Sequence, residues 1–100
     1  MLLDTLRAAW RRCLDGETHS LEHRADLLLA MAHAMSNAVQ AVELACSIAG
    51  TTAFRTTSPL ERCFRDVQTI RHHVWTSEQR YGTFGQVRLG VPPDFPVVAF

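Results

Sequence analysis

The chain has 100 residues, 47% of them hydrophobic and 20% charged, and its ten basic and ten acidic side chains cancel. This composition is typical of one globular domain and excludes disorder, and the zero net charge gives no electrostatic reason to expect a nucleic acid or an anionic membrane as partner. The three cysteines are widely spaced and form no metal-ligand pattern, so we expect no metal and a reducing, cytoplasmic setting. No signal peptide or long uncharged apolar stretch is recognisable, so we expect no membrane segment.

The first predicted helix runs from the N-terminus to a stop near Gly16. Apolar side chains recur in it at steps of three and four, whereas the charged side chains lie largely off that stripe. The stripe consists of Leu3, Leu6, Trp10 and Cys13.

The second predicted helix is nearly thirty residues long, with Ser20 as its N-cap and Glu22 in its first turn, where a carboxylate complements the helix dipole. Two apolar stripes share this helix, and two stripes need packing neighbours on two sides. A helix about 45 Å long also exceeds the dimensions of a compact 100-residue domain, so we expect the chain to self-associate within something larger. One stripe is Leu21, Ala25, Leu28, Ala32, Met35, Val39, Val42 and Cys46, and the other is Leu27, Met31, Ala34, Ala38, Ala41, Ala45 and Ile48.

A third helix is predicted from the sequence Ser58-Pro59-Leu60-Glu61, which combines an N-cap serine, a proline at the first helical position and a glutamate at the third. We expect it to break near Trp75. Thr76 and Gln79 repeat the capping-box pattern and predict a short fourth helix, which holds Tyr81, Phe84 and Val87.

The prolines of the tail exclude a helix there, and we expect the tail to lie extended across a neighbouring surface. These prolines are Pro92, Pro93 and Pro96. The predicted fold is all-α, an incomplete up-and-down helical bundle that takes in residues 1–100.

His72 and His73 are adjacent imidazoles and are the natural candidates for chemistry. At 100° per residue His73 falls beside the apolar face of its helix and His72 points away from it, so His73 is the better candidate. The alternative is a boundary histidine that hydrogen-bonds a carbonyl or packs against the next element. Nearby, Arg62 and Asp66 have the spacing of an ordinary ion pair within a helix.

The segment from Ser47 to Thr76 resembles the C-terminal helical domain of the acyl-CoA dehydrogenase superfamily. In that family a helix ends in a Gln-x-x-Gly-Gly turn, followed by an aromatic residue, a proline, and then Glu-Arg and Arg-Asp. The corresponding residues here, without a gap, are Ser47, Gly50, Thr51, Phe54, Pro59, Glu61, Arg62, Arg65 and Asp66. Residues 81–85 and 89–90 resemble the branch that carries the type 2 C-terminal domain.

One departure from the family is informative. Many of the dehydrogenases continue with Tyr-Glu-Gly-Thr, whose glutamate abstracts the substrate proton, and this chain has His73, Val74, Trp75 and Thr76 instead. Valine cannot accept a proton. Related two-component flavin monooxygenases typically have a histidine eight residues after the helix arginine, and Arg65 and His73 have that spacing. The resemblance therefore implies that His73 is catalytic and orients the substrate or donates a proton at the flavin.

The resemblance also implies that Gly50, Thr51 and Thr76 contact a flavin, FAD or FMN, with the first two near the dinucleotide of a neighbouring subunit. It implies a homo-oligomer, expected to be a tetramer, and an enzyme whose N-terminal helical and middle β domains are absent from these 100 residues. We expect the chain to be inactive alone. Two alternatives stay open: a true acyl-CoA dehydrogenase whose base lies elsewhere, and a non-catalytic helical interaction module.

Overall fold

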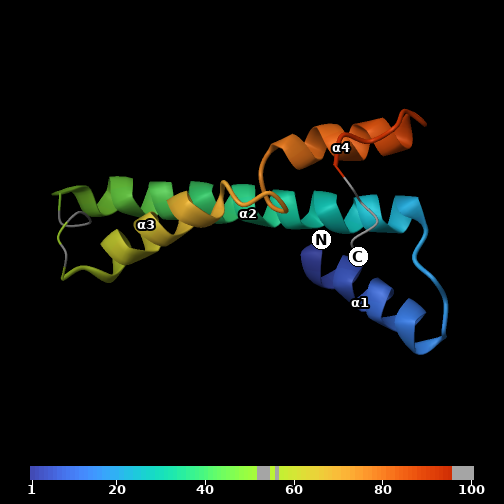
Figure 1. The fold of residues 1–100 in the computed structure, drawn as a ribbon. Coiled ribbons are helices and arrows are strands. Elements are labelled where there is room, and N and C mark those ends of the chain that lie inside the picture. Colours follow the sequence, from blue (N-terminus) through green and yellow to red (C-terminus); the bar gives the residue numbers. More distant parts are fainter. Residues whose placement is uncertain (52–54, 56, 96–100) are drawn as a thin grey trace.

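A computed structural model of the chain describes residues 1–51, 55 and 57–95. Within these residues it contains four α-helices and no strand, which confirms the all-α prediction (Figure 1). The helices are α1 (Leu2–Leu14), α2 (Leu21–Ala49), α3 (Pro59–Ile70) and α4 (Gln79–Arg88). Phe54, the aromatic position of the family turn, and residues 96–100, most of the predicted extended tail, lie outside the described residues.

The long helix α2 is the axis on which the other three helices pack. α1 and α4 lie beside its N-terminal half and α3 lies beside its C-terminal half (Figure 1). The Cα radius of gyration is 16.7 Å, against about 13 Å for a compact domain of this length. The chain is therefore elongated, and some large apolar side chains of α2, such as Leu44 and Ile48, stay exposed.

Serine caps begin α2 and α3 as predicted. Ser20 Oγ accepts a hydrogen bond from the backbone N–H of His23 at 3.2 Å, and Ser58 Oγ accepts one from Leu60 at 3.3 Å. Such caps satisfy N–H groups that have no partner inside the helix and are worth about 1 kcal/mol each. Gly50 ends α2 with a φ of 66°, a conformation that glycine adopts without strain.

The two apolar stripes of α2 differ in how far this chain covers them. The first is largely buried, with Leu28 at 0% exposure and Val39 at 4%. The second is only partly covered, and its last member, Ile48, is 83% exposed. The prediction that both stripes have packing neighbours is therefore met inside the chain only for the first stripe.

Helix α1 turns its apolar stripe away from the rest of the chain. Leu3 and Trp10 are both exposed, whereas Ala9 is the buried residue of this helix. α1 thus contacts α2 through the small side chain of Ala9. The side chains of Leu3 and Trp10 are not packed against other described residues to the extent that would bury them.

The core between α2 and α4 is built around Leu28, with Ala25 and Val87 beside it. Trp75 and Phe95 pack against this cluster and meet edge to face, with ring centroids 4.9 Å apart. The segment before α4 and the segment after it therefore meet over the same part of α2. Both segments therefore cover the core cluster, each with one aromatic ring.

A buried arginine completes this packing. Arg80 is 4% exposed, and its guanidinium carbon lies 4.0 Å from the centre of the Phe95 ring. Its Nη2 donates to Gln79 Oε1 at 3.4 Å, while its Nε and Nη1 have no hydrogen-bond partner among the described residues. The aromatic ring is thus the main group that stabilises this buried positive charge.

Thr83 ties α4 to the segment that follows it. Its side chain is fully buried, and its Oγ1 donates to Asp94 Oδ1 at 2.7 Å. Thr83→Val keeps the shape of the side chain and removes the donor, so it should lower the free energy of unfolding by about 1–2 kcal/mol. Urea denaturation followed by circular dichroism measures this change.

Thr69→Val is the matched control. The exposed Thr69 hydroxyl donates to the Arg65 carbonyl of its own helix, so its loss should change the free energy of unfolding by less than about 0.5 kcal/mol. Equal losses in the Thr83 and Thr69 variants would contradict a stabilising bond to Asp94.

Helix α3 ends earlier than the predicted break near Trp75. It stops at Ile70, and residues 71–78 form a series of turns before α4. The predicted capping box at Thr76 is wrong, because the Thr76 hydroxyl donates to the Ile70 carbonyl at 3.0 Å. The N-cap of α4 is Glu78, and it makes no side-chain cap. The threonine thus closes the end of one helix instead of opening the next.

By length and composition α2 is apolar enough to cross a membrane, and 28% of its most apolar window is buried in this chain. This test is weak, because the core helix of a soluble protein passes it too. At its centre α2 carries the polar, exposed His33, Asn37 and Gln40. Such groups are costly inside a bilayer unless they find partners.

Candidate functional site

The predicted site residues occupy two places along α2. Gly50 and Thr51 lie at its C-terminal end, and His73 and Thr76 lie in the segment after α3. α3 runs back along α2 from the first place to the second (Figure 1), and its 12 residues span about 18 Å. The structure therefore puts the two pairs of residues near opposite ends of α3 and not in one pocket.

The first place is an open cleft of about 530 Å³ between the end of α2 and the side of α3. Gly50 is exposed, and a Cβ added to it would meet no atom within 4 Å. Thr51 is exposed as well. A flat ligand or another protein surface can therefore lie against the backbone here. The lining residues are Glu43, Cys46, Ser47, Gly50, Thr51 and Phe64.

The electrostatics of this cleft disfavour an anion. The carbonyl groups at the C-terminal end of a helix carry a partial negative charge, and the Glu43 carboxylate also lines the cleft. The Gly50 N–H already donates to the Cys46 carbonyl, and the Ser47 hydroxyl donates to the Glu43 carbonyl at 3.0 Å. The cleft is therefore better suited to an uncharged group than to a phosphate.

Arg71 fixes the start of the segment that carries the histidines. Its Nη1 lies 3.7 Å from Glu43 Oε1 on α2 and donates to Gln68 Oε1 on α3 at 3.1 Å. Its Nη2 lies 4.0 Å from Glu78 Oε1, just before α4. One guanidinium thus links α2, α3 and the residue before α4 at the place where the chain turns.

The backbone of His73 is held within a tight turn. Its N–H donates to the Ile70 carbonyl at 2.8 Å, and its carbonyl accepts from the N–H groups of Thr76 at 3.0 Å and Ser77 at 2.9 Å. The imidazole is exposed, so this turn sets the direction of a side chain that stands in solvent.

A backbone contact also fixes the tautomer of His73. The N–H of Trp75 donates to His73 Nδ1 at 3.1 Å. Because a backbone N–H can only donate, Nδ1 must be unprotonated, and the neutral imidazole then carries its proton on Nε2. His73 therefore offers an Nε2–H donor to whatever covers this exposed segment.

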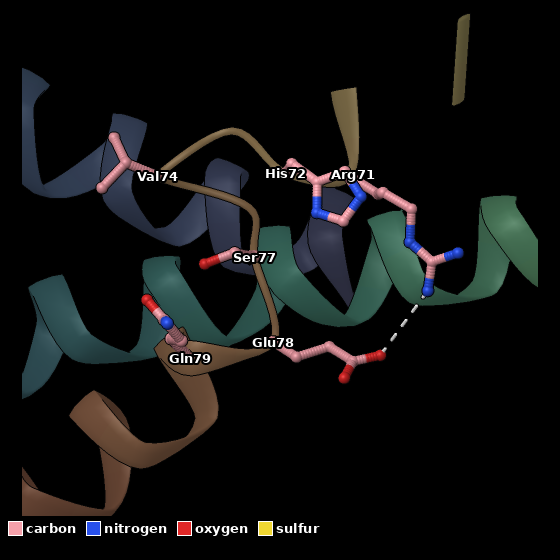
Figure 2. Close-up of a pocket in the computed structure, with 6 residues that line it drawn as sticks. All are labelled: Arg71, His72, Val74, Ser77, Glu78 and Gln79. Atoms are coloured by element: carbon pink, nitrogen blue, oxygen red, sulfur yellow. Dashed lines mark ion pairs between the residues drawn. The ribbon is translucent and has the colours of Figure 1, made fainter. Parts of the chain in front are cut away.

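The other histidine of the pair lines a cleft. This cleft has a volume of about 360 Å³. Figure 2 shows the His72 ring beside the Arg71 side chain, with Ser77 and Gln79 across from them. His73 is not among its lining residues. The helical wheel that favoured His73 assumed a helix continuing to residue 73, and α3 ends at Ile70, so the wheel does not describe either ring. The His72 cleft could not be found from periodicity for the same reason.

Thr76 lies half-buried in a narrow cleft between its own segment and α2, opposite Val39 and Gln40. Its hydroxyl donates to Ile70, which leaves the oxygen able to accept a further hydrogen bond. No group of three or more His, Cys, Asp or Glu side chains that could hold a metal occurs among the described residues.

Comparison with known proteins decides the family. A profile of the acyl-CoA dehydrogenase C-terminal domain matches residues 1–78, which is most of the chain. The chain belongs to this family. An indole-3-acetate monooxygenase of Pseudomonas putida is 27% identical to it over 90 residues, which make up 90% of this chain and 23% of that protein. No solved structure matches the chain significantly.

The family match confirms the resemblance found in the sequence, and the monooxygenase relative fits the monooxygenase-like branch. The chain is thus a helical domain of an oxidoreductase family. The matched residues include both the cleft at the end of α2 and the segment with His73, and they stop at the start of α4. The chain spans only 23% of the length of the relative, so most of that protein has no counterpart here.

Proposed function

We propose that this chain is the C-terminal helical-domain portion of a flavin-dependent oxidoreductase of the monooxygenase type. The observation that carries the proposal is the family match over residues 1–78 together with the monooxygenase relative. At the position where the dehydrogenase family has its glutamate base, this chain has Val74, which cannot take a proton. The residue that precedes it, His73, has a polar side chain next to this position.

His73 is the proposed catalytic residue. Its exposed imidazole keeps a donor on Nε2, because Nδ1 accepts from the Trp75 backbone. An N–H held on a neutral imidazole orients a substrate through a hydrogen bond, whereas a general base needs an unprotonated nitrogen facing the substrate. The geometry therefore supports a donor role for His73 and argues against its acting as the missing dehydrogenase base.

Gly50, Thr51 and Thr76 are the proposed flavin contacts, with FAD or FMN as cofactor. When bound, the flavin supplies the redox chemistry. The open backbone at Gly50 suits a flat ligand, and the partial negative charge at the end of α2 favours a ring or ribose over the pyrophosphate at this position. Thr76 can contribute as a hydrogen-bond acceptor.

The proposed partners are the remaining flavoprotein domains and further copies of the chain, in a cytoplasmic tetramer. Exposed apolar side chains support this proposal, because Trp10 is 66% exposed and Ile48 is 83% exposed. The N-terminal helical and middle β domains would supply the rest of the flavin site. Alone, the chain offers only one wall of that site and is proposed to be inactive.

Two other functions are weighed against this one. The family profile is named for the dehydrogenase, which favours acyl-CoA dehydrogenation with a base from another domain. The exposed apolar side chains of α1 and α2, such as Trp10 and Ile48, favour a helical interaction module without catalysis.

Anaerobic and aerobic assays of the complete enzyme separate these functions. We expect acyl-CoA to leave the visible flavin absorbance unchanged without oxygen, and we expect an oxygenated product to form from indole-3-acetate when reduced flavin and oxygen are supplied. Bleaching of the flavin by acyl-CoA without a supply of reduced flavin would establish the dehydrogenase and overturn our proposal. A native polypeptide that carries no flavoprotein domains and binds no flavin would establish the interaction module.

A further inference from the structure

Outside the flavin-related segment, Cys13, His19 and Arg12 form a cluster where the end of α1 meets the loop before α2. Cys13 Sγ lies 3.2 Å from His19 Nε2, and Arg12 Nε lies 3.4 Å from His19 Nδ1. Cys13 is exposed, whereas His19 and Arg12 are half-buried. The imidazole thus stands between a guanidinium and an accessible sulfur.

The order of these groups fixes the direction of the hydrogen bonds. The Arg12 Nε–H can only donate, so His19 Nδ1 must accept, and the neutral imidazole then carries its proton on Nε2. That N–H faces the sulfur of Cys13 at 3.2 Å. The sulfur is therefore an acceptor, and the contact strengthens when the sulfur is negatively charged.

One feature of the fold opposes this effect. Cys13 is in the last turn of α1, whose terminal carbonyl groups carry a partial negative charge. The Arg12 guanidinium and the donor N–H of His19 act in the opposite direction at shorter range. We infer that Cys13 is a reactive thiol that forms mixed disulfides with low-molecular-weight disulfides.

The reaction is a thiol–disulfide exchange. The Cys13 thiolate attacks one sulfur of the disulfide, a new S–S bond forms, and the original S–S bond breaks. The other half leaves as a thiolate with the electron pair of the broken bond, so Cys13 is oxidised and the reagent is reduced. His19 acts as a positioning residue, because its N–H donates to the sulfur at 3.2 Å and does not contact the reagent.

The chain contains a matched control for this reactivity. Cys63 on α3 is also exposed, but no hydrogen bond to its sulfur is found among the described residues, and Cys46 is buried. Exposure alone predicts equal rates for Cys13 and Cys63. Activation by His19 predicts a higher rate for Cys13 only.

The test uses 5,5′-dithiobis(2-nitrobenzoate) as the disulfide and follows release of its coloured thiolate from the full 100-residue chain at neutral pH. Cys63→Ser leaves Cys13 as the exposed thiol, and Cys13→Ser leaves Cys63. We expect Cys13 to react at least about tenfold faster than Cys63. Mass spectrometry of the peptides assigns the labelled residue, and an unlabelled Cys46 shows that the fold is intact.

Two further variants in the Cys63→Ser background test the mechanism. His19→Ala should reduce the rate of Cys13 to that of Cys63, and the exposed His72→Ala should leave it unchanged. Because His19 lies in a loop outside the core, its replacement should not unfold the chain. Equal rates for Cys13 and Cys63, or an unchanged rate in His19→Ala, would overturn the inference.

Discussion

Leu28→Ala is expected to lower the free energy of unfolding by about 3–4 kcal/mol. Leu28 is 0% exposed and lies where α2 meets α4, against Ala25 and Val87. Truncation of a buried leucine costs the lost transfer free energy of its methyl groups plus a term for the cavity, and measured values for such changes run from about 2 to 5 kcal/mol. Urea denaturation followed by circular dichroism gives the number.

The size of this effect follows from the shape of the molecule. The chain is elongated, so few of its side chains are fully buried. The contact between α2 and α4 therefore depends on a small number of buried side chains, with Leu28 at their centre. Few buried neighbours are available to fill a cavity at Leu28 by shifting. The variant should also expose the Trp75 side chain that packs on this cluster, which tryptophan fluorescence would report.

Leu44→Ala is the control for this variant. Leu44 belongs to the same helix and loses the same atoms, but it is 65% exposed in this chain. Its replacement should change the free energy of unfolding by less than about 0.5 kcal/mol. Similar losses in the two variants would mean that Leu28 is not the centre of the core.

The helix starts were predictable because they depend on local chemistry. Ser20 and the Ser58-Pro59 pair act within one helical turn, and their side chains cap the helices that the sequence predicted. The two stripes of α2 were also predictable, because periodicity within a helix needs no tertiary information. The family resemblance was recognisable because the residues that carry it lie in one continuous segment, Ser47 to Thr76.

The end of α3 was not predictable from the same rules. Thr76 carries a capping signal for the next helix, but its hydroxyl instead reaches back six residues to the Ile70 carbonyl. A threonine hydroxyl in this position can bond either to the end of the preceding helix or to the start of the next one. Which of these bonds forms depends on how the following segment packs. The directions of the His72 and His73 rings depend on this turn, and so periodicity could not assign them.

The side of α1 that packs against the rest of the chain could not be predicted from the sequence either. Its apolar stripe is the obvious contact surface, and yet Ala9 is the buried residue. The contact between Cys13 and His19 could not be predicted either, because the two residues are six positions apart and a loop brings them together. This spacing matches no helix or strand period. Side-chain clusters of this kind follow from loop geometry and not from patterns.

His73→Ala in the complete flavin enzyme is expected to lower turnover by about 10²- to 10³-fold, which is the usual contribution of one hydrogen-bond donor held at the reacting group. The reason is that Nε2–H is held by the Trp75 backbone contact and has no equivalent in alanine. Flavin binding should change little, because Gly50 and Thr51 lie at the end of α2, and alanine at position 73 keeps the backbone carbonyl that accepts from the N–H of Thr76. His73→Gln keeps an N–H donor of similar reach and should lose less activity than His73→Ala.

The most direct test of this account compares His73→Ala with His72→Ala in the complete enzyme, measuring turnover and flavin affinity for both. The two residues are neighbours and both are exposed, so a general disturbance of the segment would affect the two variants alike. We expect His73→Ala to lose at least about a hundredfold in turnover and His72→Ala to lose less than about threefold, with flavin affinity within about twofold of the parent in each. Unchanged turnover in His73→Ala, or a larger loss in His72→Ala, would contradict the account.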